Sequence, residues 1–232
     1  MHRLLHACSF SRSFSTAALP TAHNFSFGAC GFLISYHLGV AQGLQDAGFI
    51  LASSKFAGAS GGAIVALSLA ANASMNDIQE EVKAMTRLCH SHGTIWRLEK
   101  RLRATFHAKF GNLPVEKLTQ RLTIATEKMW PWRALVLTDT FRSTDDLCDA
   151  LIASCYVPWY LARRGTSVFR GEYHVDGGLI TLVPKVPGYT KLARFALFPP
   201  RIEVLDQLFE SGKRSARIWA AQAGENDMKG KQ

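Results

Sequence analysis

Apolar and polar positions divide the chain into short and long patterned segments. Short apolar or alternating segments predict β-strands at residues 25–27, 54–57, 118–126, 134–138 and 168–176. Longer segments predict helices at residues 32–47, 63–70, 76–89, 98–110 and 144–154. Strands that alternate with helices are typical of α/β proteins, so we expect a sheet with helices on both faces.

Three details refine this picture. Residues 63–70 are apolar nearly all round, which fits a buried helix or a buried strand. Their alanines and the glycine pair before them favour a helix. Thr144 is expected to be the N-cap of its helix. Beyond Pro200 the pattern predicts an amphipathic tail.

Size and composition fit one globular domain with tails. The chain has 232 residues, of which 47% are apolar, enough for a sizeable core. No apolar run approaches the roughly 20 residues that a membrane span needs. The first 45 residues contain no Asp or Glu but include Arg3, Arg12 and several serines. This is typical of an organelle-import presequence over residues 1–23; an unstructured N-terminus without that role is the alternative.

Positive charge is concentrated in the middle of the chain. The formal net charge is +9, and residues 97–133 contain nine Lys or Arg and three Glu, a net +6. Such a segment favours an anionic partner, either phospholipid or nucleic acid, or is simply a solvated helix face. No nucleic-acid-binding motif accompanies it, so we expect a lipid partner and no nucleic acid.

The cysteines point away from disulfides and metals. There are five of them, without CxxC spacing and without a zinc-type cluster. Their number is odd and the chain is not small, so free thiols in a reducing compartment are the simplest account. We therefore expect no bound metal.

The strongest chemical signal is the G-x-S-x-G sequence Gly58-Ala-Ser-Gly-Gly62, between a predicted strand and an apolar helix. A tight strand-to-helix turn needs glycines beside the serine, because the backbone is strained and neighbouring side chains would clash. The turn lifts the Ser60 hydroxyl clear of the sheet, above a helix N-terminus whose free N–H groups favour negative charge. We therefore expect Ser60 to be a nucleophile; a glycine-rich loop with an incidental serine is the alternative.

Two further segments can supply the groups that such a nucleophile needs. Gly28-Ala-Cys-Gly31 follows the first predicted strand, and its backbone N–H groups can stabilise an oxyanion or bind a phosphate. Neither a G-K-[ST] sequence nor full G-x-G-x-x-G spacing follows it, which disfavours a nucleotide site. Asp176 ends a predicted strand and precedes two glycines, so it can reach a neighbouring loop; an ordinary turn aspartate is the alternative.

A Ser-His-Asp triad is the competing arrangement. In α/β-hydrolases the histidine follows the acid along the chain, but no histidine follows Asp176. His174 could serve only an earlier acid. His90 and His92 lie in a polar, basic stretch and are expected at the surface. The order of residues therefore counts against a triad.

Taken in this order, the three segments resemble the patatin-like phospholipase family over about residues 25–184. The stretch Ala153-Ser-Cys-Tyr-Val-Pro158 is similar to the one before the catalytic aspartate in animal triglyceride-lipase-type members. The resemblance implies a three-layer α/β/α fold with a mainly parallel central sheet. It implies a catalytic domain over residues 24–200, with residues 201–232 as a C-terminal tail. One departure is Ala29, where the family usually has Gly.

The resemblance also implies a Ser60–Asp176 dyad that hydrolyses acyl esters of phospholipids or acylglycerols without a cofactor. Asp176 would accept the Ser60 proton as Ser60 attacks the ester carbonyl. The oxyanion would be held by the backbone N–H groups of Gly28, Ala29, Cys30, Gly31 and Gly61. Because alanine does not easily adopt positive φ, we expect Ala29 to alter or weaken this turn.

The alternatives are a transacylase, which passes the acyl group to an alcohol, and a catalytically silent lipid-binding or membrane-docking module. Trp130 and Trp132 flank a proline, so we expect them in a loop. They are better candidates than Trp159 and Tyr160 for contact with a membrane or lipid-droplet surface, with core packing as the alternative. We expect an intracellular protein peripheral to a membrane, with the mitochondrion or plastid as candidate compartments.

Overall fold

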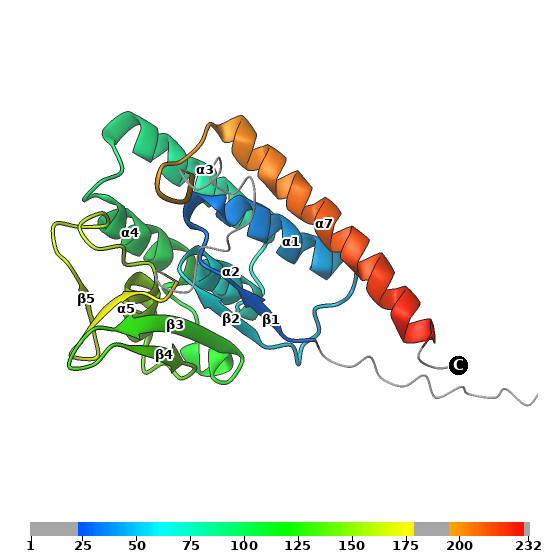
Figure 1. The fold of residues 1–232 in the computed structure, drawn as a ribbon, viewed down its shortest axis with the longest axis horizontal. Helices are drawn as coiled ribbons and strands as arrows, with labels where there is room; N and C mark the ends of the chain where they lie inside the picture. The colour runs from blue at the N-terminus through cyan, green and yellow to red at the C-terminus, as the bar shows by residue number, and fades with distance from the viewer. Residues whose placement is uncertain (1–22, 179–194, 230–232) are drawn as a thin grey trace, which may run out of the picture.

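The structure is a computed structural model that describes residues 23–178 and 195–229, and the side chains up to residue 223. Its strands are β1 (Phe25–Phe27), β2 (Phe56–Ala59), β3 (Leu122–Lys128), β4 (Ala134–Thr138), β5 (Ser167–Phe169) and β6 (Glu172–Asp176) (Figure 1). Its helices are α1 (Ile34–Asp46), α2 (Gly61–Ala70), α3 (Met75–His92), α4 (Leu98–Phe110), α5 (Thr144–Ser154) and α7 (Ile202–Lys229). Two short 3-10 helices are η1 (Gly31–Leu33) and η2 (Val115–Leu118). The predicted presequence lies outside the described residues, apart from its last residue.

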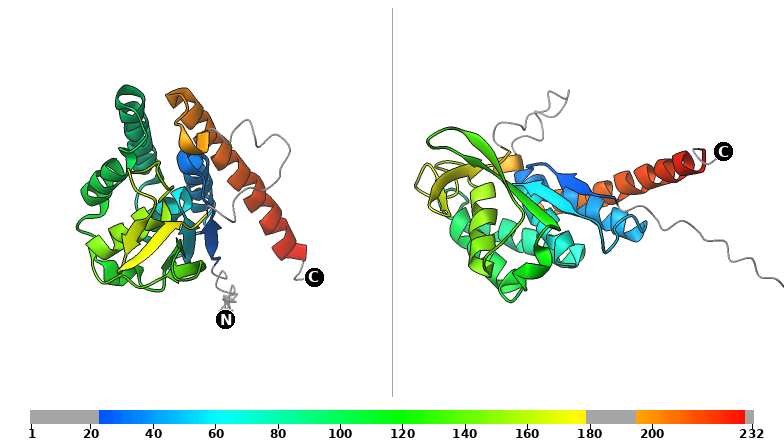
Figure 2. Two further views of the ribbon diagram at one scale, coloured as in Figure 1. Left: turned by 60° about the vertical axis from the view of Figure 1, so that its left-hand side comes forward. Right: turned by 90° about the horizontal axis from the view of Figure 1, so that it is seen from below.

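The predicted α/β class is confirmed, with parallel strands at the centre of the sheet. The strand order is β1-β2-β3-β6-β5, and β4 pairs with β3 as well. β1, β2 and β3 run parallel, whereas β4 and β6 run antiparallel to β3. α2 packs on β1, β2 and β3, and α5 packs on β3, β5 and β6; the two helices touch, so they share one face of the sheet (Figure 2).

Three predicted strands differ from the observed ones, and the first of them, predicted at 54–57, is observed two residues later as β2. The segment 168–176 forms a hairpin, because Arg170 and Gly171 both have positive φ and turn the chain between β5 and β6. The strand predicted from Leu118 begins at Leu122, because the four preceding residues include the end of η2. The N-cap of α5 is Ser143 instead of Thr144: the Ser143 hydroxyl accepts a hydrogen bond from the Asp146 N–H (3.1 Å).

The apolar segment before Ala71 is helix α2, as its alanines indicated. Nine of the ten residues of α2 are buried, because the sheet, α1, α3 and α5 surround it. A helix that is enclosed on all sides has no polar face. It can therefore hold the turn at its N-terminus in a fixed position.

The predicted amphipathic tail forms α7, which packs along α1 (Figure 1). Leu205 and Phe209 on its apolar side are buried. The two backbones come into contact through glycines: a Cβ on Gly39 would lie 1.9 Å from the Phe209 carbonyl oxygen, and one on Gly212 would lie 2.1 Å from a carbonyl oxygen of α1. The apolar face of the predicted tail is therefore the face of α7 that packs against α1. The domain boundaries at 24, 200 and 201 stay predictions.

The basic segment 97–133 is partly neutralised by acids elsewhere in the fold. Lys109 pairs with Glu81 at 2.8 Å, and Arg103 pairs with Asp149 at 2.7 Å. Arg133 pairs with Glu127 within the segment. None of the helices in the described part of the chain is both long and apolar enough to cross a membrane.

Candidate active site

The C-terminal ends of β2 and β6 meet on one edge of β3. β2 runs parallel to β3, and its last residue, Ala59, pairs with Ala125. β6 runs antiparallel to β3, and its last residue, Asp176, pairs with Thr126. Both strands lie on the same edge, because β4 pairs with β3 along the other edge at these positions. Ser60 and Asp176, which are distant in the chain, are therefore brought together.

The backbone of Ser60 has a conformation that residues with side chains rarely adopt. Its φ is 55° and its ψ is −131°, as expected for a nucleophile on a sharp strand-to-helix turn. The neighbouring glycines are required by space: a Cβ on Gly58 would lie 2.3 Å from the Gly62 carbonyl oxygen, and one on Gly62 would lie 2.2 Å from the Phe27 carbonyl oxygen. Such a conformation costs about 1–3 kcal/mol, so the surrounding contacts must stabilise it.

Ser154, the last residue of α5, provides such contacts. Its Oγ accepts a hydrogen bond from the Ser60 N–H (2.9 Å) and donates one to the Ala125 carbonyl oxygen (2.7 Å). Its own carbonyl oxygen accepts from the Gly177 N–H (3.3 Å). Ser154 therefore links the nucleophile turn, the central strand and the end of β6. It lies in the stretch that resembles animal lipases, but no sequence pattern indicated this role.

Asp176 places a buried carboxylate beside Ser60. Asp176 is 4% exposed and lies close enough to Ser60 for the serine side chain to lower its pKa. One of its carboxylate oxygens also accepts from the Gly178 N–H (2.8 Å). Burial raises the pKa of Asp176 to about 6, although the Ser60 side chain and the Gly178 N–H both act to lower it. The group is thus mostly ionised at neutral pH yet more basic than an exposed aspartate, which suits a proton acceptor.

The predicted oxyanion turn lies against the first turn of α2. A Cβ on Gly61 would lie 2.7 Å from the Cys30 Sγ and 3.3 Å from the Gly31 nitrogen. The Gly61 N–H lies in the first turn of its helix and has no acceptor within it. The left-handed conformation falls on Gly31, with φ 52°, and Ala29 does not have a positive φ. Ala29 therefore does not adopt the positive φ that alanine disfavours.

Two buried thiols flank this arrangement. Burial raises the pKa of the Cys155 thiol well above its ordinary value, and nearby Asp176 raises it further, whereas a hydrogen bond with Ser60 lowers it. Burial and Asp176 also raise the pKa of the Cys30 thiol. Both groups are therefore neutral and add no negative charge beside the carboxylate. Four cysteines in the described residues are free, and no cluster of metal-ligating side chains occurs in that part of the chain.

Among the described residues, no histidine forms a hydrogen bond with Ser60. His174 is buried, with its Nδ1 3.0 Å from the Thr126 Oγ1 and its ring against Phe169. None of these contacts joins it to Ser60. His90 and His92 are exposed, as expected.

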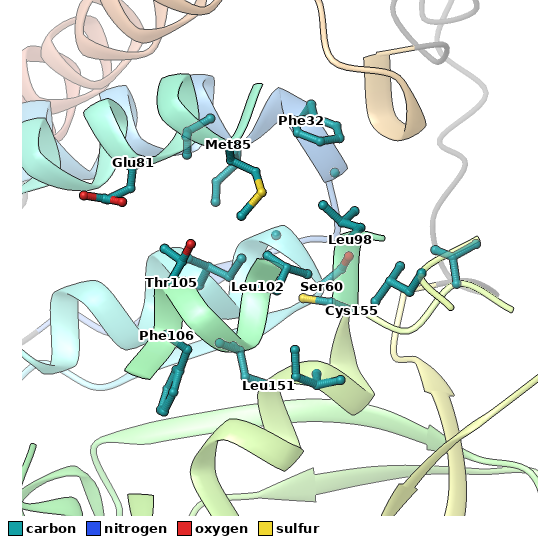
Figure 3. A pocket seen from close by; sticks show the side chains of 18 of the residues that line it. Phe32, Ser60, Glu81, Met85, Leu98, Leu102, Thr105, Phe106, Leu151 and Cys155 are labelled. Atoms are coloured by element: carbon teal, nitrogen blue, oxygen red, sulfur yellow. The ribbon is translucent and has the colours of Figure 1, made fainter. Parts of the chain in front are cut away.

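An apolar cavity opens from Ser60 between α3, α4 and α5 (Figure 3). Its empty volume is about 1040 Å³, part of it open to solvent. α4 lines it with a stripe of side chains from Leu98 to Phe110. Glu81 and Lys109, which form an ion pair, also line it. Ser60 lies near Leu98, whereas Glu81 lies at the opposite end (Figure 3).

The tryptophans are more exposed than core packing would allow. Trp130 and Trp132 lie in the loop between β3 and β4, as predicted, and are 71% and 81% exposed. Trp159 is 65% exposed, whereas Tyr160 lines the cavity.

Comparisons with known proteins found relatives of this chain. Residues 25–184 match the model of the family described as patatin-like phospholipase. The 1-acylglycerol-3-phosphate O-acyltransferase of Mus musculus is 28% identical over 176 residues, which are 73% of this chain and 42% of the mouse protein. Human patatin-like phospholipase domain-containing protein 4 is 31% identical over 176 residues, 71% of this chain and 67% of the human protein. VipD from Legionella pneumophila aligns with a TM-score of 0.43 and 14% identity, over 73% of this chain and 48% of VipD.

Proposed function

Since this chain belongs to the patatin-like phospholipase family, we propose that it is a serine hydrolase that cleaves acyl esters of phospholipids or acylglycerols. One observation carries the proposal: the strained Ser60, beside the buried carboxylate of Asp176, lines an apolar cavity. A nucleophile, a base and a space for an acyl chain then lie together.

The chemistry follows from these positions. Asp176 accepts the hydroxyl proton as the Ser60 Oγ forms a bond to the ester carbonyl carbon. The negative charge that develops on the carbonyl oxygen is stabilised by the N–H of Gly61 and those of the Gly28–Gly31 turn, each donor contributing about 3–4 kcal/mol. The alcohol leaves with the proton from Asp176. Water then attacks the acyl-enzyme by the same route, releasing the free acid.

The cavity favours a long, unbranched acyl chain. The stripe from Leu98 to Phe110 extends along about 18 Å of helix at about 1.5 Å per residue. An extended alkyl chain advances about 1.3 Å per carbon, given a C–C bond of about 1.5 Å, so about 14 carbons fill this length. A longer chain would reach the Glu81–Lys109 ion pair.

Acyl transfer is a second candidate function, because the name of the mouse relative describes an acyltransferase. The same acyl-enzyme would then react with an alcohol in place of water. Incubation with a labelled phospholipid, with and without 1-acylglycerol-3-phosphate, distinguishes the two. Hydrolysis gives labelled free acid in both cases, whereas transfer moves the label to the added acceptor.

The central test uses a fluorophosphonate probe on the full chain. We expect the native chain and a Ser143→Ala control to be labelled, and Ser60→Ala to lose both labelling and ester turnover while staying folded. Turnover that persists in Ser60→Ala would contradict the assignment of the nucleophile. A folded native chain that is neither labelled nor active would instead support the silent lipid-binding module.

A further inference from the structure

Three segments each have some side chains that line the cavity and others that are exposed on the protein surface. Residues 95–98, 157–163 and 195–198 each contribute a lining residue to the cavity: Leu98, Tyr160 and Leu197 are examples. The same segments also present exposed aromatic rings. Trp96 is 50% exposed, Trp159 is 65% exposed and Phe198 is 52% exposed. We call these three rings, with Arg163, the aromatic rim.

Direct contacts join the aromatic rim to the cavity wall. The Trp96 N–H donates to the Tyr160 carbonyl oxygen (2.7 Å), and the Trp96 Nε1 donates to the Trp159 carbonyl oxygen (2.7 Å). The rings of Tyr160 and Phe198 lie 6.2 Å apart at near right angles. The Tyr160 hydroxyl donates to the Leu197 carbonyl oxygen. The rim is therefore one connected surface that directly contacts the wall of the cavity that Ser60 lines.

The backbone of the rim is strained at both tryptophans. Trp96 has φ 64° and Trp159 has φ 60°, a left-handed conformation that bulky side chains rarely adopt. Each residue thus combines backbone strain with an indole that is half exposed or more. Asparagine would fit this conformation better and would expose less apolar surface. Strain that persists at such positions points to a functional demand for the aromatic side chain.

The charge of the rim identifies the surface that it fits. The guanidinium of Arg163 stacks over the Trp96 ring, 4.7 Å from its centroid, whereas the next residue, Arg164, pairs with Glu99 at 2.5 Å. Residues 95–98, 157–163 and 195–198 contain two arginines, Arg97 and Arg163, and no Asp or Glu. Aromatic rings interleaved with arginine suit the interface of a bilayer that carries anionic headgroups.

We propose that the aromatic rim docks the chain on an anionic phospholipid bilayer, with the cavity mouth facing the lipid. This step rests on the proposed function, because it supplies the lipid from which an acyl chain enters the cavity. The sequence favoured Trp130 and Trp132 for this contact. Their loop contributes no residue to the cavity, so docking through that loop alone would leave the mouth without a lipid source.

The experiment measures binding of the full chain to sedimented vesicles of phosphatidylcholine with phosphatidylserine, of phosphatidylcholine alone, and to triacylglycerol emulsion. In the native chain, binding transfers the exposed Trp159 indole from water into the bilayer interface. Because Trp159→Asn removes this indole, we expect the variant to bind the anionic vesicles about tenfold more weakly. Arg163→Gln should reduce the preference for anionic vesicles about fivefold. Trp132→Asn is the matched control, with the same substitution at a site that is 81% exposed, and should bind as the native chain does.

Two further measurements separate docking from folding and from catalysis. The melting temperature of Trp159→Asn should equal or exceed that of the native chain, and its turnover of a soluble short-chain ester should be unchanged. Ser60→Ala should bind vesicles normally, so a wrong nucleophile assignment leaves the docking result intact. The proposal is overturned by a native chain that does not bind anionic vesicles, by equal binding to all three surfaces, or by a loss of binding in Trp132→Asn and not in Trp159→Asn.

Discussion

In the proposed mechanism Asp176 links activity to stability, because the burial that makes its carboxylate more basic also opposes folding. The pKa of its carboxyl rises from an ordinary 3.8 to about 6 in the fold. The folded protein therefore holds this proton more tightly than the unfolded chain does. Stability that is fully present below pH 3.8 is lost as the pH rises through about 6. A shift of one pKa unit corresponds to about 1.4 kcal/mol. The free energy of unfolding is therefore lowered by about 3 kcal/mol at pH 8 and by roughly half of that at pH 5.

The Asp176→Asn variant removes the charge and keeps an oxygen acceptor for the Gly178 N–H. We expect it to be more stable than the native chain by up to about 3 kcal/mol at pH 8, and by roughly half as much at pH 5. It should also lack ester turnover. In the native chain, turnover should fall as the pH drops through about 6, because a protonated carboxyl cannot accept the Ser60 proton.

Urea unfolding of both proteins at the two pH values measures the difference in free energy. Asp139→Asn is a suitable control, because it changes the same atoms at an exposed position. A stability gain for Asp176→Asn that is equal at both pH values would refute the reasoning from burial. Turnover retained by Asp176→Asn would refute its role as the base.

Two other predictions concern the support of Ser60 and the length of the cavity. Ser154→Ala leaves the Ser60 N–H and the Ala125 carbonyl oxygen without their hydroxyl partner, so we expect a loss of about 1–3 kcal/mol in thermal unfolding and a clear fall in kcat. Ser143→Ala, which removes only a helix cap, should cost about 1 kcal/mol and leave kcat unchanged; equal effects of the two on kcat would argue against a positioning role for Ser154. Leu102→Trp fills the middle of the cavity, so the ratio of kcat/KM for a long-chain ester to that for a butyrate ester should fall about tenfold or more, and an unchanged ratio would place the acyl chain elsewhere.

Much of the site was predictable because its constraints are local. A glycine is needed where two backbones are in direct contact. The glycines around Ser60 that make such contacts all lie within the five residues 58–62, so the sequence alone reveals them. The apolar α2 follows at once, so the strand-turn-helix could be recognised without knowledge of the rest. Asp176 was found by the same means, since two glycines follow it at a strand end.

The rest depends on contacts between distant segments, which leave no local pattern. Residues 168–176 have continuous strand character, and the lone Gly171 did not distinguish a hairpin from one long strand. The apolar stripe on α4 has the same spacing whether it packs in a core or lines a cavity. Ser154 is one hydroxyl at a helix end, and its importance arises only from the strand and turn beside it.

The pairing of β6 with β3 spans only Asp176 to His174 against Thr126 to Lys128. A shift of one residue in this ladder would turn the Asp176 side chain to the opposite face, and a shift of two would move it about 7 Å. The loop after β3 or the turn at Gly171 can therefore be lengthened without moving Asp176, provided that the three residue pairs between β3 and β6 keep their register. We therefore expect an insertion at the turn or in the loop to preserve the proposed activity, and an insertion within the three paired residues to abolish it.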